Sequence, residues 1–530
     1  MFSVRPYGGV GQIGANSTLF TLGNKKILID AGALFPLEEG LGVNVLVPKY
    51  EDLKQLDGII ITHGHEDHIG GLAVLLRNFP SVSVYTSKFT AKMLRRKNIE
   101  KRNIINVSDT SIISFGHWKF SPFYVDHSIP ETFAAVLTND HESSCIFFVP
   151  DFKINTAMGS KSHFSFEQIK KLSAKFKNKF LFVDSTNILS DQLKTPSEHE
   201  LIQPLKKLFS QSEGKIIATF FPSNVERLKL FFDLAIEYKL PVSLLGRSMK
   251  TFADLALETG YIENTPTIAE TILPHQRSLI LISGCQGDFN GSLRGIILDE
   301  NSKLKLAHKD IFIYSAKIIP GNHKKVGLIF NKIALSKTSL YHSDNYMTHV
   351  SGHAGRDDVK LLIQSFTPQA IIPIHTESYF IPAFKQWLQS EFPKIKIVSF
   401  YNGDTLTVGP EGSEGSNRFE LRGGMEKWQF DIVHDNGQVM DKHELRERRK
   451  LAESGIVSLA ILQKKGKPTY QFSFFGLPFA IQDHADFDAF IFSVLSTTRA
   501  PKDEKFIAKK VKEYFIDKYS FKPNVAVMIF

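Results

Sequence analysis

Cysteine is scarce in this chain, and its scarcity limits the kinds of metal site that the protein can build. The 530 residues include 2 cysteines, Cys145 and Cys285. Two thiols cannot supply a cysteine-based zinc site, and so low a content suits a reducing compartment. Any metal must therefore be held by histidine and carboxylate side chains.

Long apolar runs are also missing. No stretch approaches the roughly 18 consecutive apolar residues of a membrane span. The opening residues, MFSVRPYGGVGQ, lack the apolar segment of a secretory signal. We therefore expect a cytoplasmic protein with no membrane partner.

The excess of charge of one sign is modest. The chain has 64 basic and 55 acidic residues, and the resulting net charge of +9 permits a polyanionic partner without requiring one. With 42% apolar and 22% charged residues, the composition is typical of a globular protein and excludes a disordered or fibrous one. The length corresponds to about three domains.

The order of strand-like and helix-like patterns divides the chain into segments. The first part is rich in short strands and predicts a layered, sheet-based unit, whereas strands and helices then alternate as in a parallel α/β domain. A Gly/Ser-rich stretch, GPEGSEGSNR, predicts a linker before a small α+β domain. The expected segments are residues 1–195, the α/β insert 196–345, the return of the first unit 346–410, the linker 411–425 and the C-terminal domain 426–530.

The strongest chemical signal is the run T-H-G-H-E-D-H at residues 62–68, between a buried strand and a helix. His63 and His65 are placed to reach one ion, while Asp67 and His68 can turn toward a second ion nearby. Nitrogen and oxygen ligands of this kind suit zinc, with manganese as an alternative. The competing interpretation is a solvated polar loop, which so dense a cluster makes improbable.

Further ligands are needed to fix two ions, and three candidates follow strands elsewhere. His127, Asp151 and His375 each come at a strand end. Taken singly, each would more often be a capping or satisfied polar residue. Together with the 62–68 run, they indicate a metal site.

Two glycine-rich pieces have different interpretations. The run GVGQIG at 9–14 matches a dinucleotide-binding pattern, but a strand follows it where a helix is required, so we reject that function. The loop SGCQGD at 283–288 follows a parallel strand and could offer backbone N–H groups of Ser283 and Gly284 to the phosphate groups of a ligand. A plain loop is the alternative.

The array of motifs resembles the ribonuclease J family, a β-CASP subgroup of the metallo-β-lactamase superfamily. The resemblance rests on H-x-H-x-D-H at 63–68, FVDSTN around Asp184, HVSGHAG around His353, PIHTE around His375, and IPGN, NGD and ERRKLAESGIV further along. It implies an α/β fold: a metallo-β-lactamase αββα sandwich, an inserted parallel α/β β-CASP domain at 196–345 and the small α+β C-terminal domain.

The resemblance also implies the ligand set and the supporting residues. Two zinc ions per chain are expected, with manganese as the alternative. One would be held by His63, His65, His127 and Asp151, and the other by Asp67, His68, Asp151 and His375. Asp30 would support the site by orienting a ligand without touching metal.

The implied activity is hydrolysis of RNA to 5′-phosphate products, with 5′-to-3′ exonuclease and endonuclease action. The implied catalytic groups are Asp67, Asp184 and His353, and Ser351 and Gly352 join His353 in substrate binding. His353 would contact the scissile phosphate, and Asp184 would orient or share its proton. The alternatives are a turn residue for His353 and a helix cap or Asx turn for Asp184.

Other functions remain as alternatives. A DNA-directed β-CASP nuclease is disfavoured because the resemblance places a residue other than histidine at the position of His375 in that group. A small-molecule hydrolase does not need the insert, and a silent RNA-binding scaffold would not need intact ligands. Thr376 and Asp288 depart from the usual pattern and leave the balance of exo- and endonuclease action open. The resemblance further implies a homodimer or homotetramer.

Overall fold

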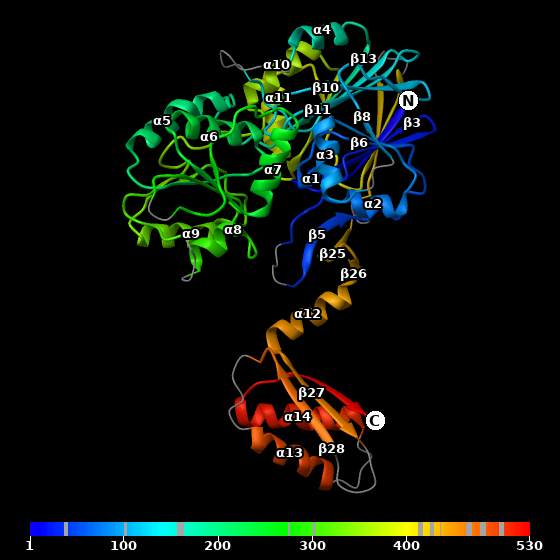
Figure 1. The fold of residues 1–530 in the computed structure, drawn as a ribbon. Coiled ribbons are helices and arrows are strands. Elements are labelled where there is room, and N and C mark those ends of the chain that lie inside the picture. Colours follow the sequence, from blue (N-terminus) through cyan, green and yellow to red (C-terminus); the bar gives the residue numbers. More distant parts are fainter. Residues whose placement is uncertain are drawn as a thin grey trace. The chain divides into compact units, whose positions relative to one another are not determined.

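A computed structural model provides the structure of the chain. It describes residues 1–36, 41–99, 103–155, 164–273, 276–299, 304–411, 417–424, 429–434, 436–462, 469–477, 484–497 and 503–530. The chain forms two compact units, one of Met1–Leu37 with Val45–Phe430 and one of Glu38–Asn44 with Asp431–Phe530. Figure 1 shows the helices and strands of each unit.

The first unit contains a sandwich of an eight-stranded and a seven-stranded sheet, in strand orders β24-β23-β1-β3-β4-β6-β7-β8 and β22-β20-β13-β12-β11-β10-β9. The strands of the first sheet are β1 (Phe2–Gly8), β3 (Ser17–Leu22), β4 (Lys25–Ile29), β6 (Gly58–Ile61), β7 (Val84–Thr86), β8 (Ile104–Asn106), β23 (Thr405–Glu411) and β24 (Asn417–Arg422). Those of the second are β9 (Ile113–Phe115), β10 (Trp118–Tyr124), β11 (Phe133–Asn139), β12 (Ser144–Val149), β13 (Asn178–Asp184), β20 (Ala370–Ile374) and β22 (Lys396–Ile397).

Aromatic side chains fill the space between the two sheets. The ring of Phe20 on β3 lies 5.3 Å from that of Phe182 on β13 and 5.8 Å from that of Phe148 on β12, each in an edge-on arrangement. All three rings are buried. In this cluster, phenylalanine therefore serves the core rather than the surface.

Helices cover the outer faces of the sandwich. The helices are α1 (Glu66–Ile69), α2 (Leu72–Asn78), α3 (Lys88–Arg96), α4 (Phe166–Ser173), α10 (Arg356–Phe366) and α11 (Phe380–Glu391). Ile169 of α4, Leu362 of α10 and Phe384 of α11 pack with Phe147 and Leu181 on the far face of the second sheet. The layering is thus the αββα arrangement expected of the metallo-β-lactamase fold (Figure 1).

The insert is a six-stranded parallel sheet in the order β16-β15-β17-β14-β18-β19. Its strands are β14 (Ile216–Thr219), β15 (Val242–Leu245), β16 (Ile268–Ala269), β17 (Leu279–Ile282), β18 (Ile311–Tyr314) and β19 (Ser339–Tyr341). Its helices are η2 (Glu198–Leu201), α5 (Ile202–Gln211), α6 (Val225–Glu237), α7 (Arg247–Glu258), α8 (Ser292–Leu298) and α9 (His323–Leu335). Helices α5 to α7 pack on one face of this sheet and α8 and α9 on the other, as a parallel sheet requires.

Part of the stretch expected to be a linker forms a strand instead. Residues 417–422 make β24, which pairs antiparallel with β23 at the edge of the eight-stranded sheet. Phe419 lies opposite Val408 and packs against the core, so alternation of apolar and polar residues overrides the glycine and serine before it. Residues 412–416 lie outside the described residues, and the boundaries of the expected segments stay predictions.

The second unit carries more helix than its sequence pattern indicates. Its elements are β25 (Phe430–His434), β26 (Val439–Met440), α12 (Lys442–Ser454), β27 (Ile456–Leu462), β28 (Thr469–Phe475), α13 (His484–Thr497), α14 (Glu504–Tyr519) and β29 (Asn524–Ile529). Phe487 of α13 and Phe515 of α14 pack with Leu459 on one face of the sheet β28-β27-β29. The expected charged helix is α12, whereas α13 and α14 were not anticipated.

Three short elements complete the fold, namely β2 (Val10–Gly11), β5 (Val43–Pro48) and β21 (Thr376–Glu377). Strands β2 and β21 pair in parallel next to the end of β20. No helix in the described part of the chain combines the length and apolarity needed to cross a bilayer.

The aromatic cluster between the sheets predicts a stability effect. The substitution Phe20→Ala removes a fully buried ring and should cost about 3–5 kcal/mol through lost burial and the cavity left behind. A lowered midpoint of thermal unfolding in Phe20→Ala would confirm this loss of stability. The control Leu335→Ala, at a side chain that is 81% exposed, should leave the midpoint nearly unchanged; equal midpoints for both variants would contradict the packing described.

Candidate metal centre

The polar residues singled out in the sequence meet at one edge of the sandwich because of how its strands run. Strands β12, β13 and β20 are adjacent and parallel. Asp151, Asp184 and His375 stand at or just beyond their carboxyl ends. Parallel strands present these ends on the same side of the sheet, which is where α/β proteins place their ligands.

The turn at 63–68 faces this edge from the other sheet and is held by backbone hydrogen bonds. The N–H of Ala31 donates to the carbonyl of His68 at 2.9 Å, and the N–H of Asn16 donates to that of Asp67 at 2.8 Å. A Cβ atom at Gly32 would come within 1.7 Å of the Asp67 carbonyl oxygen. Only glycine therefore allows the 30–33 segment to approach the turn so closely.

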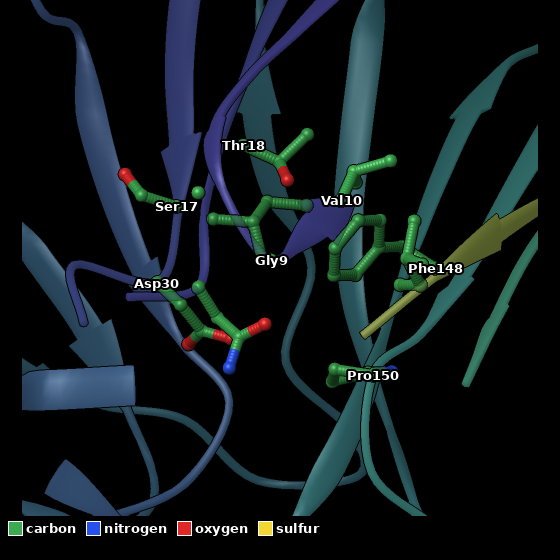
Figure 2. Close-up of a pocket in the computed structure, with 11 residues that line it drawn as sticks. Gly9, Val10, Ser17, Thr18, Asp30, Phe148 and Pro150 are labelled. Atoms are coloured by element: carbon green, nitrogen blue, oxygen red, sulfur yellow. The ribbon is translucent and has the colours of Figure 1, made fainter. Parts of the chain in front are cut away.

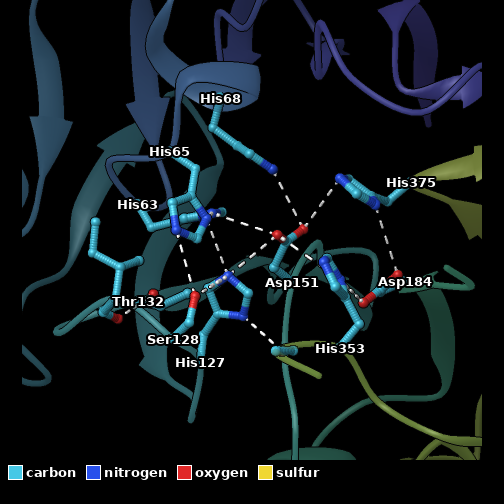
Figure 3. A network of polar contacts seen from close by, with 12 residues as sticks. His63, His65, His68, His127, Ser128, Thr132, Asp151, Asp184, His353 and His375 are labelled. Carbon is cyan, nitrogen blue, oxygen red and sulfur yellow. Dashed lines mark hydrogen bonds and ion pairs between the residues drawn. The ribbon is translucent and has the colours of Figure 1, made fainter. Parts of the chain in front are cut away.

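One group of ligand atoms consists of His63, His65, His127 and Asp151, which all lie within 4.8 Å of one another. His65 Nδ1 is 3.1 Å from His63 Nε2 and 3.2 Å from His127 Nε2. Asp151 Oδ2 lies 3.5 Å from His63 Nε2 and 3.4 Å from His127 Nε2. Figure 3 shows these side chains pointing toward one another.

A second group forms around the other oxygen of the same carboxylate. Asp67, His68 and His375 again offer ligand atoms within 4.8 Å of one another. Asp67 Oδ2 lies 3.2 Å from His375 Nε2, and Asp151 Oδ1 lies 3.4 Å from His68 Nε2 and 3.7 Å from His375 Nε2. Asp151 therefore stands between the two groups, one oxygen toward each.

Hydrogen bonds on the far side of the imidazole rings determine which nitrogen carries the proton. His127 Nδ1 lies 2.7 Å from the carbonyl oxygen of Gly352, which can only accept, so Nδ1 is protonated. His68 Nδ1 is likewise 2.7 Å from Asp30 Oδ2. In the neutral forms, the Nε2 atoms that face Asp151 therefore carry lone pairs.

Two threonine hydroxyls act in the same way on the other rings. The hydroxyl of Thr62 donates to Asp30 and lies 3.0 Å from His63 Nδ1. That of Thr186 donates to Asp184 at 2.6 Å and lies 2.7 Å from His375 Nδ1. Each hydroxyl has a single proton to donate, so it accepts from the imidazole, and in the neutral rings the Nε2 atoms of His63 and His375 again face inward without a proton.

This arrangement fits bound cations. Asp151 Oδ1 is buried and has no hydrogen-bond partner among the described residues, while imidazole lone pairs converge on it. Lone pairs that face a buried carboxylate repel it unless positive charge lies between them. Nitrogen and oxygen donors of this kind suit zinc or a similar divalent metal.

The pKa values reflect the same demand for positive charge. Burial would lower the pKa of His375, but the carboxylates of Asp151, Asp67 and Asp184 raise it to about 9. Burial is the largest cause of the lowered pKa values of His63, which falls to about 3, and of His65, which falls to about 4, and the neighbouring His68 adds to both effects. Burial thus favours the neutral form of His63 and His65, whereas the nearby carboxylates favour the protonated form of His375.

Asp30 is fixed from behind by close packing. Its carboxylate accepts from the backbone N–H of Thr62 at 2.8 Å, besides its bond to His68. Figure 2 shows the cavity beside it, which is also lined by Gly9 and Phe148 and has a volume of about 10 Å³. Such a volume holds roughly one water molecule, so Asp30 has little room to move.

Asp184 and His353 form a pair next to the two groups, and His353 also offers a ligand atom within 4.8 Å of those of Asp151 and His375. His353 Nδ1 donates to Asp184 Oδ2 at 2.8 Å, and the other oxygen accepts from the N–H of Thr186. Burial would lower the pKa of His353, but the carboxylates of Asp184 and Asp151 raise it. The His353 side chain is 23% exposed, whereas Asp184 is buried, so this pair connects the buried site with its accessible side.

The other candidate substrate residues lie in two places. The hydroxyl of Ser351 accepts from the N–H of His353 and from the amide of Asn187, so it shapes the turn that carries His353. Ser283 and Gly284 follow β17 in the insert and share no hydrogen bond with the two ligand groups within the described residues. Ser283 is buried, and its contact with RNA stays a prediction.

Several contributors were missed by the sequence analysis. Thr62, Thr186 and the carbonyl of Gly352 contact the outer nitrogens of candidate ligand histidines, and Ser223 from the insert lies 3.1 Å from His65 Nε2. Thr62 and Thr186 stand next to predicted site residues, which is a usable signal. Ser223 lies 158 positions from its partner, and no local pattern indicates it.

Comparison with known families agrees with this geometry. Residues 10–124 match the metallo-beta-lactamase superfamily, residues 213–333 match "Ribonuclease J, beta-CASP domain", and residues 345–399 match "Zn-dependent metallo-hydrolase RNA specificity domain". The matched regions cover the turn at 63–68, the insert, and the return segment with His353 and His375. They support a metal-binding nuclease that acts on RNA.

Individual relatives span most of the chain. Ribonuclease J of Sinorhizobium meliloti is 30% identical over 86% of this chain and 82% of its own length, and that of Synechocystis is 29% identical over 87% and 73%. A crystal structure of an Enterococcus faecalis protein of unknown function, 17% identical, covers 79% of this chain and 100% of its own with a TM-score of 0.52, which bears on the fold alone. Taken with the two ligand groups around Asp151, these similarities show that the chain belongs to the ribonuclease J family.

Proposed function

We propose that this protein is a two-zinc ribonuclease that hydrolyses RNA phosphodiesters to leave 5′-phosphates, by both 5′-to-3′ exonuclease and endonuclease action. The observation that supports it best is the convergence of two ligand groups on the carboxylate of Asp151. Membership of the ribonuclease J family supports RNA as the substrate.

The residues present divide into two ligand sets. His63, His65, His127 and one oxygen of Asp151 would hold one zinc, and Asp67, His68, His375 and the other oxygen of Asp151 would hold the second, with manganese as the alternative. Bound divalent ions supply Lewis acidity at the phosphoryl oxygens and lower the pKa of a water molecule. The protein's part would be to aim the Nε2 atoms of four histidines at these positions, with the proton of each neutral ring held on Nδ1.

His353 and Asp184 would handle the proton on the accessible side. Asp184 accepts from His353 Nδ1 and thereby fixes the ring. The carboxylate of Asp184 also favours the protonated form of the His353 imidazole. A protonated imidazole suits an acid that contacts the scissile phosphate and gives a proton to the leaving oxygen. Ser351 and Gly352 would bind substrate from the same turn, and Ser283 and Gly284 from the insert.

We also propose a cellular location and an oligomeric state for the enzyme. The low cysteine content supports a cytoplasmic location, and we propose a homodimer or homotetramer. Light scattering on the full chain, compared with a chain ended at Phe430, where the first unit ends, would measure the oligomeric state and the contribution of the C-terminal unit to it.

Time courses on end-labelled RNA test the activity. Substrates with a 5′-monophosphate or a 5′-triphosphate are compared with DNA of the same sequence. We expect nucleoside 5′-monophosphates released from the 5′ end, together with internal fragments that carry 5′-phosphates. Products with 3′-phosphates, or equally rapid cleavage of the DNA, would argue against the proposal.

Removing a ligand of the second group should separate catalysis from binding. The variant Asp67→Ala is expected to abolish hydrolysis but to retain part of the RNA affinity, because phosphate contacts elsewhere remain. Turnover and filter binding measure the two effects. Glu66→Ala is the matched control, since Glu66 is the neighbouring carboxylate and pairs with Lys97 outside the site; unchanged turnover in Asp67→Ala would defeat the assignment.

Substitution of His353 or Asp184 should lower the rate of hydrolysis without loss of bound metal. His353→Ala and Asp184→Asn should each lower kcat by roughly 100- to 10,000-fold, the usual contribution of general acid catalysis. Metal content, measured by elemental analysis, should stay near that of the unaltered protein. Loss of metal together with rate would instead assign these residues to the ligand set.

Asp30 gives a prediction about metal affinity. Asp30→Asn keeps the shape of the side chain but removes the charge that His68 Nδ1 contacts, so we expect metal binding to weaken by roughly 10- to 100-fold. Competition with a chromophoric chelator measures the effect. Asp254→Asn, an exposed carboxylate on α7, serves as the control, and equal affinities for both variants would rule out the supporting role.

A further inference from the structure

The insert contacts one of the candidate zinc ligands directly. Ser223 precedes α6 of the insert, and its hydroxyl lies 3.1 Å from His65 Nε2 in the turn at 63–68. The hydroxyl of Ser128 is the only other partner recorded for this nitrogen within the described residues, at 3.4 Å. Ser223 therefore provides the shorter contact, and it comes from a different domain.

His65 is oriented in the opposite sense to the other ligand histidines. Its Nδ1 faces His63 Nε2 and His127 Nε2 at 3.1 and 3.2 Å, so Nδ1 is the nitrogen that would bind metal. The neutral ring then carries its proton on Nε2, which must donate outward. Ser223 Oγ stands where this N–H needs an acceptor.

The source of this outer partner sets His65 apart. The outer partners of His63, His68, His127 and His375 are Thr62, Asp30, Gly352 and Thr186, all of which belong to the sandwich. His65 is thus the ligand whose orientation depends on the insert.

A buried ionic network fixes the turn that carries Ser223. The guanidinium of Arg227, fully buried, donates to Glu198 Oε2 at 2.6 Å and Oε1 at 3.0 Å, and to the carbonyl of Ser315 at 2.9 Å. The side chain of Asn224 accepts from the N–H of Arg227 at 2.9 Å and donates to Glu198. Charged groups paired this fully hold the first turn of α6 rigidly within the insert.

The same network reaches across to the sandwich. The ammonium of Lys153, a residue only 1% exposed, lies 3.6 Å from Glu198 Oε1 and 3.6 Å from Glu226 Oε2. Lys153 follows Asp151 by two positions. The loop that carries Asp151 is therefore tied to the turn that carries Ser223.

We propose that Ser223 is a positioning residue for the metal centre, so that zinc affinity depends on how the insert is docked. The insert, through Ser223, keeps Nδ1 of His65 free for metal, and the contacts of Lys153 with Glu198 and Glu226 keep Ser223 in place. This inference rests on the metal centre proposed above and deepens it.

Zinc affinity of the full chain tests the inference without relying on activity. Competition with a chromophoric chelator is measured for the unaltered protein, Ser223→Ala and Ser223→Thr. We expect Ser223→Ala to weaken one of the two zinc sites by roughly 10- to 100-fold, as for other outer partners of metal-bound histidine. Ser223→Thr retains the hydroxyl and should restore most of the affinity.

Matched controls separate this role from general damage. Ser210→Ala makes the same change at an exposed position on α5 of the insert and should bind zinc normally. Lys153→Met should weaken the same site, and the double variant with Ser223→Ala should lose little more than the single variants, because both act through one turn. Thermal unfolding of the zinc-free variants shows whether each has folded.

The outcomes are distinguishable. If the unaltered protein binds two zinc ions and Ser223→Ala binds them equally well, the inference is overturned while the proposed function stands. The inference is also overturned, and the proposed function still stands, if Ser128→Ala weakens zinc binding and Ser223→Ala does not. If the unaltered protein binds no zinc, both the inference and the two-zinc proposal fail.

Discussion

The buried carboxylate of Asp151 is the constraint on which the site depends. Its two oxygens face different sets of imidazole nitrogens, and one of them has no hydrogen-bond partner among the described residues. A charge in this position is costly unless opposite charge surrounds it. Much of the surrounding architecture, from the parallel ends of β12, β13 and β20 to the turn at 63–68, serves to bring that opposite charge close.

The direction of each imidazole is settled by an outer partner, and every one of these partners except Thr62, which precedes His63, belongs to another stretch of chain. A carboxylate, a carbonyl group and three hydroxyls determine which nitrogen of each ring is free. These partners come from both sheets of the sandwich, the return segment and the insert. The ligand geometry is therefore a property of the complete first unit rather than of its motifs.

Local sequence carries some of this information and omits the rest. The H-x-H-x-D-H run and the polar residues at strand ends indicated the ligand candidates, because dense histidine and strand-end placement are local signals. The contacts of Ser223 with His65 and of Gly352 with His127 span 158 and 225 positions, so only the folded chain reveals them. In the same way, the sequence pattern did not predict β24 because glycine-rich residues precede it. It did not predict α13 and α14 because the composition around them is irregular.

The position of β20 has a consequence for biosynthesis. This strand lies between β13 and β22 in its sheet, yet it is translated only after the entire insert. A nascent chain thus displays the turn at 63–68 long before His375 leaves the ribosome. A truncated product that stops within the insert lacks both β20 and the candidate ligand His375, so premature termination yields a fragment without the complete second ligand group.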